Sequence, residues 1–197
     1  MAMNFKIFND DELLSIYTAD ILRKQVHNNP ESILALELNK DLNWTYEKFA
    51  GEVTQHPADF SQVYIAAVNS NGNADIFNHL DIPKGQLKTR GTSEQLSSIL
   101  GGKKQVNLAL LNIGANGGVG YSGSGDDELL FAARELILVA AGADKAKAVR
   151  ELYDAAENGS EAFSKVKRHR MVTVVLDSAA ASKLDPDIAE YYTSVFA

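Results

Sequence analysis

Glycines gather in one stretch of this chain, at the end of an apolar run. Residues 106–128 read VNLALLNIGANGGVGYSGSGDDE, with six glycines between Gly114 and Gly125. Glycine lets a backbone adopt left-handed conformations and lets it approach a ligand closely. We therefore take this glycine loop as the candidate functional site and the rest of the chain as the elements that position it.

Three of these glycines match a nucleotide-binding pattern. Gly118, Gly120 and Gly123 spell G-x-G-x-x-G, which in a dinucleotide-binding unit brings the backbone close to a pyrophosphate at a helix N-terminus. The match is short, and the acidic residues that follow the loop would repel a pyrophosphate. A nucleotide-binding or anion-binding module at the glycine loop remains one alternative.

Other chemical patterns near the loop are incomplete. A serine nucleophile on a sharp turn would need G-x-S-x-G, and Ser124 stands in place of the last glycine. Asp126, Asp127 and Glu128 could supply an acid or a base, but acidic residues in a first helical turn also stabilise the helix dipole. The chain has no cysteine, and its four histidines lack metal-ligand spacing, so we expect neither a metal nor a cofactor.

Charge and hydropathy exclude two kinds of partner. The net charge is -7 and the isoelectric point is near 5.1, whereas a nucleic-acid-binding surface normally has a basic surplus. No run reaches the roughly 18 apolar residues of a membrane span, and the N-terminus is acidic where a signal peptide would be basic. We expect a cytoplasmic protein without a nucleic-acid or membrane partner.

One basic cluster stands out against this acidic background. It consists of Lys165, Lys167, Arg168, His169 and Arg170. The cluster is interpreted as a solvated approach to the strand that follows, with anion binding as the alternative.

Apolar segments that alternate with amphipathic ones indicate the elements. Buried strands are predicted at residues 32–38, 62–68, 106–113, 135–141 and 171–176. Helices are predicted at residues 11–27, 44–53, 74–80, 94–100, 144–158 and 187–197, with a short helical turn opened at residues 126 and 127. The apolar positions of the first helix predict its buried face: Leu13, Leu14, Ile16, Tyr17, Ile21 and Leu22.

This alternation predicts an α/β fold of three layers, with a mostly parallel sheet flanked by helices. No repeat or composition shift divides the chain, so residues 1–197 are expected to form a single domain. Ligands of such sheets bind at the carboxyl ends of the strands, beside the point where the strand order reverses. The loop that follows Ile113 is the expected place.

Four stretches, in order along the chain, carry a family resemblance. They are IFNHLDIPKGQL, NLALLNIGANGGVGYSG, ELILVAAGADKAKAV and MVTVVLDSAAASKL. Together they resemble the family of glucosamine-6-phosphate deaminases (isomerases) and 6-phosphogluconolactonases, over roughly Ile33 to Leu184. The resemblance implies a Rossmann-like fold, a sugar-phosphate ligand and a role in carbohydrate metabolism, in a shortened and diverged member.

The signature loop of this family usually reads G-x-D-G-H-x-A followed by Phe and, in the deaminases, by Asn-Glu. Gly114 and Gly117 fall on the glycines of that pattern. Asn116 stands where the resemblance implies the catalytic aspartate, Gly118 where it implies the histidine, and Gly123 where it implies the glutamate. None of the three can transfer a proton at neutral pH.

Other family positions also differ. The glycine-rich phosphate loop implied after the first strand is replaced by LNKDL at residues 38–42, and the acids implied after the second strand are replaced at residues 68–70. Lys145 opens its helix as the phosphate-contacting lysine of the family does. The resemblance therefore implies these ligand-binding residues: Lys145, Gly114, Asn116, Gly117 and Tyr121.

Together these observations predict a diverged glucosamine-6-phosphate or galactosamine-6-phosphate isomerase (deaminase)-like protein. We expect it to lack the standard catalysis and at most to bind a sugar phosphate. One alternative is an active sugar-phosphate isomerase or lactonase with replaced catalytic groups, such as Asp126, Asp127 or Glu128. Association into a homo-oligomer stays open, because the last helix could pack on the sheet or on a second subunit.

Overall fold

A computed structural model describes residues 3–68, 74–88, 105–120, 127–155 and 160–194. Its strands are β1 (Asn4–Phe8), β2 (Ile33–Glu37), β3 (Tyr64–Val68), β4 (Leu87–Lys88), β5 (Leu108–Asn112), β6 (Glu135–Ala140) and β7 (Val172–Asp177). Its α-helices are α1 (Asp11–Asn28), α2 (Asn43–Gln55), α4 (Asp127–Phe131), α5 (Ala146–Asp154), α6 (Glu161–Arg168) and α7 (Pro186–Ser194). Three short 3₁₀ helices are η1 (Lys40–Leu42), η2 (Ala74–His79) and η3 (Ala143–Lys145).

The seven strands form one parallel sheet in the order β1-β7-β6-β5-β2-β3-β4. The strand order reverses between β2 and β5, because the chain leaves β2 toward one edge of the sheet and leaves β5 toward the other. The carboxyl ends of these two strands therefore border the place where parallel sheets usually bind ligands. The predicted α/β fold with a mostly parallel sheet is confirmed.

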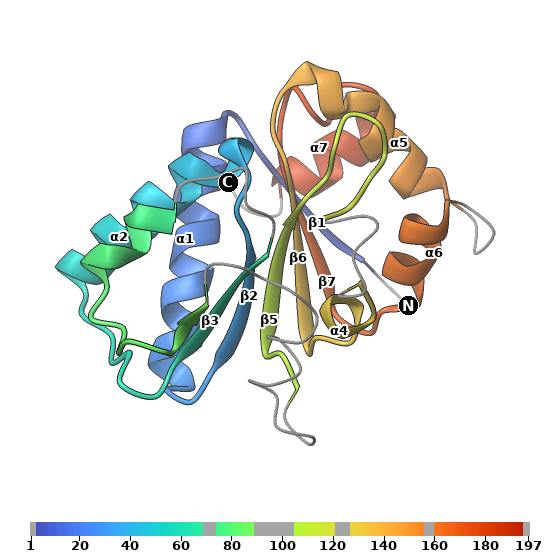
Figure 1. Ribbon diagram of the computed structural model, residues 1–197. Helices are drawn as coiled ribbons and strands as arrows, with labels where there is room; N and C mark the ends of the chain where they lie inside the picture. The colour runs from blue at the N-terminus through green and yellow to red at the C-terminus, as the bar shows by residue number, and fades with distance from the viewer. Residues whose placement is uncertain (1–2, 69–73, 89–104, 121–126, 156–159, 195–197) are drawn as a thin grey trace.

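Helices cover both faces of the sheet and give the three predicted layers (Figure 1). Along each strand the side chains alternate between the faces, so that Leu110 packs into one core cluster and Leu111 into the other. The cluster with Leu110 includes α1 and α2, and the cluster with Leu111 includes α4, α5 and α6 with α7 packed against it. The helices change face where the strand order reverses.

Two strands and one helix were not predicted. The sequence NFKIF forms the edge strand β1, and only two residues pair in β4. The helix predicted over 144–158 ends at Asp154, and a separate helix, α6, follows it. The helix predicted at 94–100 lies outside the described residues.

The predicted buried face of α1 was partly wrong. Leu13 and Ile16 are 44% and 38% exposed, whereas the polar Ser15 and Thr18 are buried. Ser15 faces α2, where its hydroxyl oxygen accepts a hydrogen bond from Thr45 Oγ1 at 3.3 Å, and Thr18 Oγ1 donates to the Leu14 carbonyl at 2.8 Å. These hydrogen bonds, one to α2 and one within α1, satisfy the two hydroxyls, so α1 can bury polar side chains at these positions.

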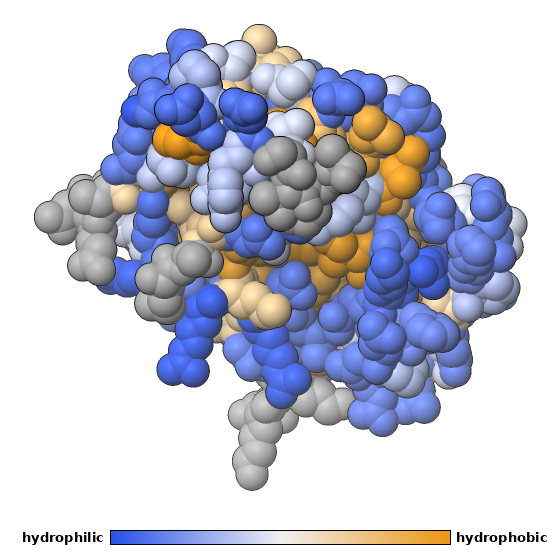
Figure 2. All heavy atoms as spheres, turned by 180° about the vertical axis from the view of Figure 1, so that it is seen from behind, coloured by the Kyte–Doolittle hydropathy of each residue, from blue (hydrophilic) through white to orange (hydrophobic). Residues whose placement is uncertain are grey.

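The surface seen from behind is mostly hydrophilic, with a few apolar patches between the polar side chains (Figure 2). None of the helices in the described ranges is both long and apolar enough to cross a membrane.

Candidate functional site

A buried carboxylate joins the two strands at the reversal of strand order. Glu37, the last residue of β2, is 2% exposed. Its Oε2 accepts a hydrogen bond from the Asn112 N–H of β5 at 2.7 Å, and its Oε1 accepts one from Asn39 Nδ2 at 3.2 Å. Tyr46 donates its hydroxyl to the Glu37 carbonyl at 2.6 Å. Burial, and then the Glu37 charge, raise the pKa of Tyr46 well above its usual value, which keeps this hydroxyl a donor.

An ion pair spans the same edge of the sheet. Lys145 Nζ, at the end of η3, lies 2.5 Å from Asp41 Oδ2 in η1. The Lys145 side chain is 7% exposed and that of Asp41 is 30% exposed. Asn39 holds the Asp41 segment by accepting the Asp41 N–H at 3.0 Å. The predicted binding residue Lys145 is therefore at the expected edge, already paired with a carboxylate of its own chain.

Asn112 completes this cluster. Its Nδ2 lies 3.5 Å from Asp41 Oδ2, a weak hydrogen bond, and its buried Oδ1 has no hydrogen-bond partner among the described residues. The opposite amide orientation would place an oxygen against the Asp41 carboxylate, so this orientation is the favourable one. We call Glu37, Asp41, Asn112 and Lys145 the switch-point cluster.

Asp177 has a structural role beside the cluster. Its carboxylate accepts the Gly142 N–H through both oxygens, at 3.1 and 3.0 Å, and the Ala180 N–H at 2.7 Å. Gly142 has a φ of 96°, which a residue with a side chain rarely adopts. These bonds fix the turn from β6 into η3, which carries Lys145.

The described part of the glycine loop is a closed turn. The N–H groups of Gly114 and Gly117 donate to the carbonyls of Gly118 and Gly114, at 2.8 and 2.9 Å. Gly120 N–H donates to the Asn112 carbonyl at 3.0 Å, and Gly118 N–H donates to Asn116 Oδ1 at 3.0 Å. These four N–H groups already donate hydrogen bonds within the loop or to β5, so they are not available to cradle a phosphate.

The exposed Asn116 thus uses its amide oxygen to close the turn. Gly117 lies against α5 and α6, since a β-carbon at that position would sit 3.6 Å from the Phe163 ring and 3.8 Å from Glu151 Oε2. The predicted residues Tyr121 and Gly123 lie outside the described residues, as do Ser124 and Asp126.

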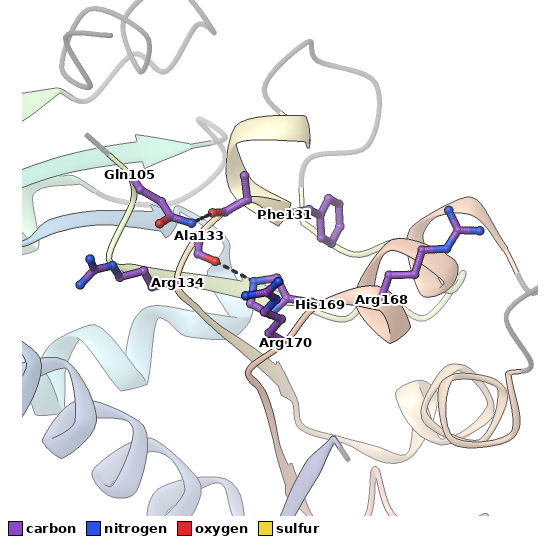
Figure 3. A pocket seen from close by; sticks show the side chains of 8 residues that line it. Gln105, Phe131, Ala133, Arg134, Arg168, His169 and Arg170 are labelled. Atoms are coloured by element: carbon purple, nitrogen blue, oxygen red, sulfur yellow. Dashed lines mark hydrogen bonds between the residues drawn. The ribbon is translucent and has the colours of Figure 1, made fainter. Parts of the chain in front are cut away.

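The basic cluster lies at the opposite edge, where β6 and β7 begin. It borders a hollow of about 370 Å³ whose lining includes Arg134, Arg168, His169 and Arg170. The guanidinium groups of Arg134 and Arg168 lie on opposite sides of His169 and point away from one another (Figure 3). His169 Nε2 donates to the Ala133 carbonyl at 2.7 Å, because its Nδ1 accepts the Met171 N–H. This arrangement fits the solvated interpretation better than a converging anion site.

Three members of the switch-point cluster were missed by the sequence reasoning: Glu37, Asp41 and Asn112. A signal was present, because Asn39 and Asp41 follow directly on a buried strand, where parallel sheets place ligand-contacting side chains. The described histidines and carboxylates include no group of three or more that could hold a metal ion.

Sequence comparison finds similar proteins over most of the chain. No protein-family model matches the chain. A glucosamine-6-phosphate deaminase of Rhodopirellula baltica is 24% identical, in a match that covers 93% of this chain and 96% of that protein. One from Geobacillus sp. is 26% identical, with 89% and 93% covered. The Rhodopirellula alignment extends over 243 positions against the 197 residues of this chain, so that relative carries segments that the chain lacks.

Solved structures show the same fold in a second group of enzymes. A monomeric glucosamine-6-phosphate deaminase superposes with a TM-score of 0.76 at 20% identity, covering 91% of this chain and 99% of that one. The 6-phosphogluconolactonase from Trypanosoma cruzi superposes with a TM-score of 0.74 at 14% identity, covering 93% and 97%. The chain is therefore a shortened relative of the glucosamine-6-phosphate deaminases, and its fold is the one that these enzymes share with the 6-phosphogluconolactonases.

Proposed function

We propose that this chain is a non-catalytic relative of the glucosamine-6-phosphate deaminases, one that kept the fold and lost the standard reaction. It binds a sugar phosphate at most, at the carboxyl ends of β2 and β5. The observation that carries the proposal is the closed turn from Gly114 to Gly120. That turn occupies the place where the family resemblance puts an acid and a base, and it offers an amide and glycines instead.

Isomerising an amino sugar phosphate requires a base that moves a proton between carbons and an acid that opens the ring. Each such group contributes typically about 10²- to 10⁴-fold to the rate. The amide of Asn116 does not titrate at neutral pH, and its oxygen already accepts the Gly118 N–H. Loss of both groups would remove most of the chemical acceleration.

Ligand binding is weakened by the same turn. A phosphate dianion is held by converging N–H donors and cationic side chains. The N–H groups of Gly114, Gly117, Gly118 and Gly120 are all used within the turn or on β5. This supports a scaffold whose affinity for sugar phosphates is low.

The test is a direct turnover assay of the purified protein. Ammonia release from glucosamine-6-phosphate and hydrolysis of 6-phosphogluconolactone are followed. The Rhodopirellula baltica deaminase is the positive control for the first reaction, and the Trypanosoma cruzi 6-phosphogluconolactonase for the second. We expect rates no higher than those without protein. Turnover that is lost in Lys145→Ala would refute the proposal and establish an active enzyme with replaced groups.

A further inference from the structure

The starting point is a lysine buried at the ligand-binding edge of the sheet. Lys145 is 7% exposed, beside the carboxyl ends of the strands where the strand order reverses. A buried ammonium group is unfavourable unless an anion compensates it. The anion at Lys145 determines what this edge can bind.

In this chain the anion is internal. Asp41 Oδ2 lies 2.5 Å from Lys145 Nζ, across 104 positions of sequence. The carboxylate does not swing freely, because the Asp41 N–H is held by Asn39 Oδ1 and Asn112 Nδ2 faces the same Oδ2. Asp41 therefore fills the position at which the phosphate group of a ligand would meet Lys145.

The remaining polar atoms of the cluster suit a phosphate poorly. A phosphate dianion has only acceptor oxygens and needs donors. Lys145 Nζ and Asn112 Nδ2 are both directed at Asp41, while Asn112 Oδ1 and the Glu37 carboxylate are themselves acceptors. An incoming phosphate would meet like charge and acceptors.

Neighbouring carboxylates strengthen this effect. Burial raises the pKa of Asp11, and the charges of Asp177, Asp10 and Asp41 raise it further, so the carboxyl edge carries a negative field. For a dianion at this edge, desolvation and repulsion would both make binding less favourable.

We propose that Asp41 determines the ligand specificity of this site: it occupies the anion position at Lys145 and so excludes ligands that carry a phosphate there. The inference rests on the proposed function, because it explains why the retained fold binds sugar phosphates weakly. The inference assigns the weak binding of sugar phosphates to the Asp41 side chain, so a single substitution should reverse it.

The experiment is a gain of binding in Asp41→Asn. This substitution keeps the shape of the side chain and removes its charge. The buried ammonium group of Lys145 then lacks the Asp41 counterion, and a bound phosphate can replace it. The unfolding temperature is measured at increasing concentrations of inorganic phosphate or glucosamine-6-phosphate, and sodium chloride keeps the ionic strength constant. We expect the variant to bind both ligands about tenfold or more tightly than the unsubstituted protein, which corresponds to about 1.4 kcal/mol or more.

Two further proteins make the result specific. The double variant Asp41→Asn with Lys145→Met carries neither charge, and we expect it to fold and to lose the gained phosphate response. Glu12→Gln makes the same change of carboxylate to amide in a surface pair with Lys48, at 2.6 Å, and we expect no phosphate response from it. Glucosamine, which lacks the phosphate, should affect the unsubstituted protein and Asp41→Asn alike.

Asp41→Asn can lose stability, since Lys145 loses its counterion. In that case phosphate should restore folding, measured as refolding yield with and without phosphate at equal ionic strength. Equal phosphate affinity in Asp41→Asn and the unsubstituted protein overturns the inference, and so does an unfolded variant that phosphate fails to rescue. Turnover of glucosamine-6-phosphate by the unsubstituted protein instead overturns the proposed function, so the two failures are distinguished by different measurements, binding and turnover.

Discussion

At the scale of the residue, Asp11 reports the negative field of the carboxyl edge. Its folded-state pKa is raised, first by burial and then by the charge of Asp177. A raised pKa means that the folded state holds the proton more tightly than the unfolded chain does. The associated stability is complete below the ordinary value of 3.8 and is lost as pH rises through the folded-state pKa.

Replacing Asp11 by asparagine should therefore stabilise the protein at pH 7, by less than about 1 kcal/mol because the side chain is partly solvated. Urea unfolding of both proteins at several pH values measures the difference, which should vanish below pH 3.8. Asp59→Asn is the opposite control, since hydrogen bonds from Ser61 lower the pKa of Asp59. That variant should be the less stable one at neutral pH. A pH-independent gain for Asp11→Asn would contradict the electrostatic explanation.

At the scale of the element, the turn after β5 depends on one backbone conformation. Gly120 has a φ of 62°, and a β-carbon there would lie 3.1 Å from both methyl groups of Leu111. We expect Gly120→Ala to destabilise the fold by about 1–2 kcal/mol, from the left-handed conformation and the crowding together. Chemical denaturation followed by circular dichroism measures the change.

Gly51 provides the matched control for that substitution. It lies inside α2, and a β-carbon there would meet nothing within 4 Å. Because glycine in a helix interior is less favourable than alanine, Gly51→Ala should raise stability by about 0.5–1 kcal/mol. If both glycines respond alike, the special conformation of the turn does not matter to stability.

Elements were predictable where the sequence signal is local. The buried strands β2, β3, β5, β6 and β7 are continuous apolar runs, and Asp10 caps α1 as its position before the helix suggests. The inward face of α1 was not predictable from hydropathy, because the buried Ser15 meets Thr45 of α2, which lies 30 positions away in the sequence. In the site, Lys145 was singled out by the family resemblance, because it opens the helix that follows a buried strand. Its partner Asp41 was not, since the two meet only after the sheet has formed.

At the scale of the whole molecule, one sheet connects two cores on opposite faces. Leu110 and Leu111 are adjacent on β5, fully buried, and belong to different core clusters. Each leucine-to-alanine change should cost about 2–5 kcal/mol through lost contacts and a residual cavity. Because both clusters share the central strands, damage to either should lower the stability of the entire chain.

We therefore expect the protein and both variants to unfold in one transition, as a single domain would. The chain has one tryptophan, Trp44 in α2, so its fluorescence reports the face covered by α1 and α2, whereas far-ultraviolet circular dichroism reports every helix. The two signals should give the same denaturant midpoint in all three proteins. If Leu110→Ala shifts the fluorescence midpoint and leaves a later dichroism transition in place, the two layers of helices unfold separately. The shared sheet would then not couple them.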